Sequence, residues 1–106
     1  MFRQGDVLLV PVAEESIPPA VLGAPGEPRD ARGRMVLALG EVTGHAHASS
    51  APGRLIRTGG DGAMLHLPEG GRLVHEEHAA IPLPSGWYRV VRQREYLPGA
   101  VRVVAD

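Results

Sequence analysis

The sequence of 106 residues contains no cysteine, no lysine and no asparagine. The absence of cysteine excludes disulfides, thiolate metal ligands and cysteine nucleophiles. Any metal ion bound by this chain must therefore be held by His, Asp or Glu. Apart from the histidines, every basic side chain is arginine, which we attribute to codon usage rather than to mechanism.

Strong net charge and long hydrophobic runs are absent as well. The net charge of −1 argues against a strong attraction to nucleic acid or to an acidic membrane. The apolar run 7–10 is far too short to span a bilayer, and no segment resembles a signal peptide. We therefore expect a cytoplasmic protein with no membrane association. The hydrophobic share of 43% is typical of a globular chain.

Windows long enough for a helix are also rare, because 14 Gly and 10 Pro interrupt the chain. What remains are about eight short β-like runs between turn signals, at 5–12, 34–39, 41–48, 54–57, 63–67, 72–78, 86–96 and 101–105. This pattern predicts an all-β barrel or sandwich with no long helix. From the length, we expect residues 1–106 to form one domain.

Residues 14–33 are the exception to this pattern. They are rich in Pro and Gly and show no periodicity. Loops of this length are usually functional or disordered. The segment is either a flap over a site or a floppy connector.

Two of the five histidines lie one residue apart in the segment 41–48. If this segment is extended, Glu41, Thr43, His45 and His47 share one face. Two imidazoles on the same side of a strand are within reach of one metal ion, which needs ligand nitrogens at about 2.0–2.1 Å. The alternative is a polar face that points at water.

A second polar group, "HEEH", follows at 75–78. On a strand, His75 and Glu77 share one face, while Glu76 and His78 share the other. If the chain turns helically, His75 and His78 meet instead. The spacing differs from that of the H-E-x-x-H metalloproteases. Alone, the segment could also be a charged loop.

Together the two segments hold four of the five histidines, which favours one shared metal centre. Its predicted ligands are His45, His47, His75, Glu76 and His78. This set suits a divalent transition metal such as Zn, Fe, Mn or Ni. Supporting or substrate-binding roles fall to Glu41, Thr43, Glu77, Arg89 and Arg92. Glu41 would orient an imidazole, and the arginines would hold an anionic small molecule. The remaining histidine, His66, is predicted to be a half-buried strand residue.

Such a centre makes the chain a metal-binding protein. With an open coordination position it would be a small metalloenzyme acting on a small molecule, and with a closed one the metal would be structural, sensed or carried. The sequence leaves both alternatives open.

A different reading is a non-catalytic binding module. In the predicted strand 86–96, alternation places arginines and aromatics on one face: Tyr88, Val90, Arg92, Arg94 and Tyr96. Such a face could contact nucleic acid or a protein partner. The balanced charge makes nucleic acid the less favoured partner. The edge strands of a small sheet protein also leave a homodimer open.

The blocks "RQGDVLLVPV", "GEVTGHAH", "HEEHA" and "YRVVRQREY" resemble a family of short, uncharacterised bacterial proteins. The resemblance covers most of the chain outside 14–33 and implies no activity.

The chain is also similar, more weakly, to small cupins. Gly40, His45 and His47 resemble the opening of the first cupin motif, whose histidines bind metal. "PSG" at 84–86 resembles part of the second motif. No Glu follows His47 at the family spacing, however, and Arg89 stands where a cupin has its last metal histidine. In a cupin-like barrel, the missing ligands would have to come from the segment 75–78.

Overall fold

The computed structural model describes residues 1–40, 42, 44–60, 62–97 and 100–103, and these form eleven short strands. The strands are β1 (Phe2–Gln4), β2 (Val7–Val12), β3 (Met35–Leu39), β4 (Ala46–Ser49), β5 (Arg54–Gly59), β6 (Gly62–Leu67), β7 (Gly71–Leu73), β8 (Ile81–Leu83), β9 (Gly86–Arg92), β10 (Arg94–Leu97) and β11 (Ala100–Val103). A 3-10 turn, η1 (Glu14–Ser16), and a four-residue helix, α1 (Pro19–Leu22), complete the described elements. The predicted all-β class is confirmed.

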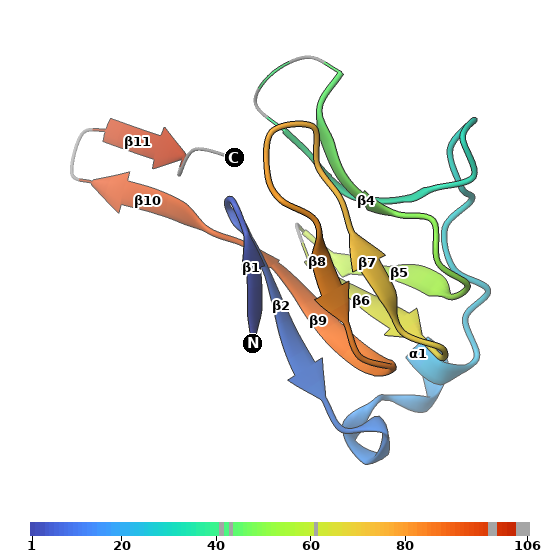
Figure 1. Cartoon of the computed structure of the whole chain (residues 1–106). Helices are drawn as coiled ribbons and strands as arrows, with labels where there is room; N and C mark the ends of the chain where they lie inside the picture. Colours follow the sequence, from blue (N-terminus) through green and yellow to red (C-terminus); the bar gives the residue numbers. More distant parts are fainter. Residues whose placement is uncertain (41, 43, 61, 98–99, 104–106) are drawn as a thin grey trace.

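An antiparallel five-stranded sheet with the order β1-β2-β9-β6-β5 organises the fold (Figure 1). The pairs β3–β4, β7–β8 and β10–β11 form separate two-stranded sheets. An isolated bridge between Ala48 and Val74 connects β4 to the end of β7. In Figure 1, the β10–β11 hairpin extends away from the other strands.

The main core lies between the five-stranded sheet and the β3–β4 and β7–β8 pairs. Alternate residues of the large sheet face this core, as the period of two in a strand requires. Its fully buried members include Leu9, Leu65 and Leu67 from the large sheet and Leu73 from β7. The sheets are layered rather than closed into a barrel, so of the two expected architectures the sandwich is the nearer.

The opposite face of the large sheet carries a second, smaller apolar cluster. Ile56, Met64 and Trp87 pack there against Ile17, with Val21 at the margin. Ile17 and Val21 belong to the segment 14–33. Residues 17–24 therefore cover part of this face of the sheet.

Several predicted strand boundaries are wrong. The strand expected at 41–48 begins only at Ala46, because a turn with Gly44 at φ +87° precedes it. The strand expected at 72–78 ends at Leu73, and 86–96 divides into β9 and β10. Strand β8 falls between two predicted strands, in a stretch for which no strand was predicted. In the described part of the chain, no helix is long and apolar enough to cross a membrane.

Candidate metal centre

A tight turn between β1 and β2 positions the first two polar residues of the site. Gln4 pairs with Val7 across the turn, which leaves Gly5 and Asp6 as its two loop residues. Gly5 has φ +58°, a conformation that a two-residue hairpin turn requires and that Gly adopts without strain. Gln4 and Asp6 are both buried.

The turn 40–45 and strand β4 position the first pair of histidines. The backbone N–H of Gly40 donates to the His45 carbonyl oxygen at 2.8 Å, and the N–H of His45 donates to the Val42 oxygen at 3.0 Å. His45 therefore lies just before β4 and is partly exposed, whereas His47 lies within β4 and is fully buried. The H-x-H pair thus reaches from the protein surface into the interior.

The second pair comes from a bend at 75–78 rather than from a strand or a helix. The reciprocal backbone hydrogen bonds between Ala48 and Val74 hold the start of this bend against β4. The N–H of Glu77 donates to Nδ1 of His75 at 3.0 Å, which fixes the ring orientation. Because this nitrogen accepts a hydrogen bond, the neutral His75 ring carries its proton on Nε2.

These segments bring four imidazole rings together, and we name His45, His47, His75 and His78 the histidine cluster. His75 is at its centre: its ring centroid lies 4.4 Å from that of His47, 4.8 Å from that of His78 and 5.6 Å from that of His45. The Nε2 atom of His78 is buried and has no hydrogen-bond partner among the described residues. The proximity of "GHAH" and "HEEH" that we inferred from the sequence is thus present in the fold.

One group within this region has the spacing of a metal site. His45, His75 and Glu76 each offer a ligand atom, and these atoms all lie within 4.8 Å of one another. Two ligands held at about 2.0–2.2 Å from one ion are at most about 4.4 Å apart, so only small side-chain movements are needed. Imidazole and carboxylate together suit Zn, Fe, Mn or Ni.

Glu76 is prepared for this role by its surroundings. Its Oε1 accepts a hydrogen bond from the N–H of Ala46 at 2.8 Å. This bond is the main cause that lowers the pKa of Glu76 below its ordinary value, and the neighbouring His45 and His75 contribute further. The side chain is exposed and is held as a carboxylate, which is the form that binds metal.

Glu77 supports His45 in the manner expected of a residue beside a ligand. Its Oε1 lies 3.3 Å from Nδ1 of His45. A carboxylate at one imidazole nitrogen orients the ring and leaves the other nitrogen available for an ion. The adjacent acidic residues thus differ in position, because Glu76 belongs to the group with His45 and His75 and Glu77 contacts Nδ1 of His45.

Buried polar side chains surround His47. Gln4 donates from Nε2 to the backbone oxygens of Leu73 and Ala79 at 3.1 and 3.0 Å, so its Oε1 accepts from Nδ1 of His47 at 2.9 Å. The Nε2 atom of His47 lies 3.5 Å from Oδ1 of Asp6, and Arg92 donates to Oδ2 of Asp6 at 2.7 Å.

The remaining predicted site residues lie elsewhere. Glu41 and Thr43 fall outside the described residues. Arg92 donates to the backbone oxygen of Leu39 and to the carboxylate of Asp6, and Asp6 is one of the buried residues beside His47. Arg89 is exposed and points to the face of the large sheet opposite the main core.

The fifth histidine, His66, is half-buried as predicted. It stacks on Trp87 with ring centroids 4.2 Å apart and lies outside the cluster.

Sequence reasoning missed Gln4 and Asp6, which precede "GHAH" by about forty residues. The only signal was "QGD", whose Gly marks a turn with a polar residue on either side. Nothing in that pattern indicates that the turn is buried against His47.

Comparison with known proteins places the chain in a family without assigning an activity. The chain belongs to the family described as Domain of unknown function (DUF8820), whose model matches residues 3–93. No curated protein matches significantly, and neither does any solved structure. The family match confirms the expectation of an uncharacterised family, while the resemblance to small cupins stays a prediction.

Proposed function

We propose that this member of the family binds a divalent transition metal ion through His45, His75 and Glu76. The observation that supports the proposal is the convergence of two imidazoles and one carboxylate whose ligand atoms lie within 4.8 Å of one another. His78 is a further candidate ligand, since its ring centroid lies 4.8 Å from that of His75 and its buried Nε2 has no hydrogen-bond partner among the described residues. The ion would be Zn, Fe, Mn or Ni.

Metal binding at His75 has a structural consequence. An ion at Nδ1 would compete for the lone pair that accepts the Glu77 N–H. An ion at Nε2 would require the ring proton to move to Nδ1, which ends the same acceptance. In either case the hydrogen bond, worth about 1 kcal/mol, is lost. The Glu77 amide is therefore a built-in reporter of metal binding.

The proposed centre lies at the surface rather than inside a closed cage. His45 is partly exposed and Glu76 is exposed. An ion at this position would keep a side open to water or to a small molecule. That arrangement is typical of catalytic rather than structural metal sites, in which the ion polarises a ligand or lowers the pKa of bound water.

The alternative binding surface on β9 receives less support. Tyr88 is buried in the main core, and its hydroxyl donates to the Pro84 oxygen at 2.6 Å. Arg92 is paired with Asp6. Neither side chain is therefore presented for stacking on bases or for phosphate contact in the way that the alternation of residues suggested.

The test is metal titration of untagged, chelator-treated protein by calorimetry, with Zn²⁺, Ni²⁺, Mn²⁺ and anaerobic Fe²⁺ as separate probes. We expect one ion per chain for at least one metal. His45→Ala and Glu76→Ala should each weaken the affinity by at least about tenfold. His66→Ala is the matched control, because it removes a histidine outside the cluster, and it should leave the affinity unchanged.

A second readout keeps the test independent of folding artefacts. In amide spectra of the parent, metal should shift the Glu77 N–H, and circular dichroism should show that the variants remain folded. Uptake that persists unchanged in both His45→Ala and Glu76→Ala would overturn the proposal. A folded parent that takes up none of the four ions would do the same.

A further inference from the structure

The face of the large sheet opposite the main core contains two adjoining cavities, neither of which is used by the proposed metal centre. The first, of about 370 Å³, lies between β9, the start of β6 and the segment around Pro18. The second, of about 430 Å³, lies over β2 and η1. They share Pro18, Met64 and Arg89, so they adjoin at Arg89 and we treat them as one groove. We name this the Arg89 groove.

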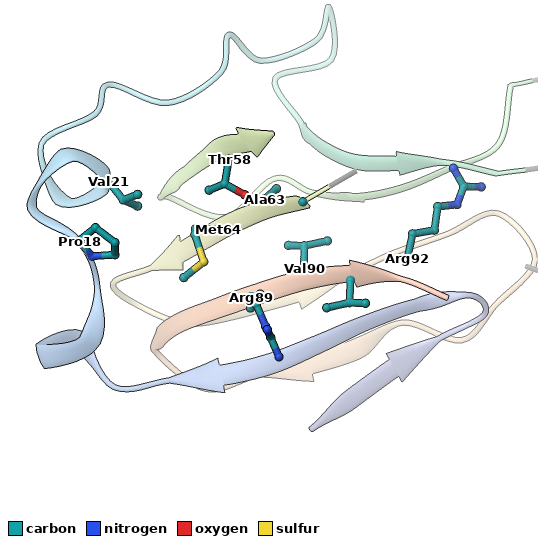
Figure 2. Close-up of a pocket in the computed structure, with 10 residues that line it drawn as sticks. Pro18, Val21, Thr58, Ala63, Met64, Arg89, Val90 and Arg92 are labelled. Atoms are coloured by element: carbon teal, nitrogen blue, oxygen red, sulfur yellow. The ribbon is translucent and has the colours of Figure 1, made fainter. Parts of the chain in front are cut away.

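The walls of the groove are mainly apolar. Val10, Val12 and Ile17 line one part, and Val21 and Met64 line the other. Figure 2 shows Pro18 and Val21 next to Met64 at one end, with Arg89 projecting from β9 and Arg92 farther along the strand. Each cavity lies in the volume range of small-molecule sites, about 300–1,000 Å³.

The charge of the groove is unbalanced. No hydrogen bond or ion pair joins the Arg89 guanidinium to another described residue. No Asp or Glu is among the described residues that line either cavity. Arg92, the other arginine at this site, already has Asp6 as its counter-ion. A guanidinium among apolar walls therefore provides one cationic group and no competing acid among the described lining residues.

From this arrangement we propose that the Arg89 groove binds a small organic carboxylate with an apolar body. The planar guanidinium matches a carboxylate with two parallel hydrogen bonds, and the apolar walls on both sides of Arg89 would cover the hydrocarbon part of the ligand. A purely inorganic anion would make no contact with the apolar walls, and a neutral hydrocarbon would leave the Arg89 guanidinium without a counter-ion. The site is independent of the metal centre.

The experiment uses octanoate as the probe. The comparison compounds are octanamide, which lacks the negative charge, and inorganic phosphate, which lacks the hydrocarbon chain. Binding to the full chain is followed by calorimetry and by chemical shifts of the Val10, Met64 and Arg89 amides. We expect saturable octanoate binding, one molecule per chain, with octanamide and phosphate at least about tenfold weaker.

Matched variants separate the groove from general charge effects. Arg89→Met should weaken octanoate binding by about ten- to hundredfold, and Arg89→Lys should restore part of it. Arg72→Met removes an exposed arginine on β7 and should change nothing. His45→Ala should also bind octanoate like the parent, which excludes coordination of the carboxylate by a metal ion.

Several outcomes would overturn the proposal. They are the absence of saturable octanoate binding, equal binding by the folded Arg89→Met variant, and phosphate binding as tight as that of octanoate. Sedimentation tests a further outcome. If the chain forms a concentration-dependent dimer that Arg89→Met abolishes, the groove is the contact surface for a second copy of the chain instead.

Discussion

The histidine cluster has a buried half and an exposed half, and the two differ in how their polar atoms are satisfied. His47 is fully buried and is enclosed by Gln4 and Asp6, which are themselves tied to backbone oxygens and to Arg92. In the exposed half, the described carboxylates beside His45 each make one such side-chain contact, Glu76 with the Ala46 amide and Glu77 with Nδ1 of His45.

This difference indicates a division of tasks. Buried polar groups are costly unless their partners are complete, so the network around His47 must be assembled for the chain to fold. The exposed half has solvent as an alternative partner, so its residues can exchange water for an ion at little cost to the fold. We therefore expect substitutions in the buried half to change stability and substitutions in the exposed half to change metal affinity.

The largest expected effect is that of Asp6→Ala. The substitution removes a fully buried carboxylate and leaves the Arg92 guanidinium and His47 without it. Breaking a buried charge pair from one side costs about 3–5 kcal/mol. Urea denaturation should show this loss in the free energy of unfolding. Glu27→Ala, which breaks the exposed pair with Arg57, should lose much less, and equal losses would contradict the comparison.

Gln4→Ala should follow with a somewhat smaller effect. It removes three hydrogen bonds, two of them buried and one partly buried, and leaves two backbone oxygens and the His47 Nδ1–H without their partner. We expect a loss of about 2–3 kcal/mol in the free energy of unfolding.

The control for Gln4→Ala is Gln93→Ala, which removes a glutamine whose side chain accepts a single exposed hydrogen bond from Arg3. A Gln4 variant that is as stable as the Gln93 variant would show that the buried half is not needed for folding.

In the exposed half, Glu77→Gln should leave stability nearly unchanged and weaken metal binding. The carboxylate at 3.3 Å from His45 Nδ1 orients the ring, and an amide does this less well. We expect about a tenfold loss of affinity. Calorimetric titration of the variant beside Glu69→Gln, which changes an exposed acid in a turn, measures the effect. If Glu77→Gln lost more free energy of unfolding than free energy of metal binding, the expected difference between the two halves would be contradicted.

The two halves also differ in how far the sequence could predict them. The concentration of four histidines in two short segments was sufficient to predict that they meet, because few histidines were available and both segments were β-like. The buried partners could not be predicted, since Gln4 and Asp6 reach His47 only through the packing of the β1–β2 turn against β4, which belongs to another sheet. Local geometry was missed where Gly44 turns the chain and where 75–78 bends, because hydrophobic alternation carries no information about such turns.

His66 provides a reference outside the cluster and the smallest expected effect. Burial beside Trp87 is the main cause that lowers the pKa of His66 below its ordinary 6.5, and the nearby positive charge of Arg54 lowers it further. The folded chain therefore binds a proton at this position less readily than the unfolded chain. It follows that the contribution of neutral His66 to stability is complete above pH 6.5 and is lost as the pH falls through the folded-state pKa.

We expect NMR titration to place the His66 pKa below 6.5, and His66→Phe to lose less stability than the parent on acidification through that window. A His66 pKa at or above 6.5 would contradict this prediction. A larger loss of stability on acidification in His66→Phe than in the parent would also contradict it. That result would assign the pH dependence of folding to the histidine cluster instead.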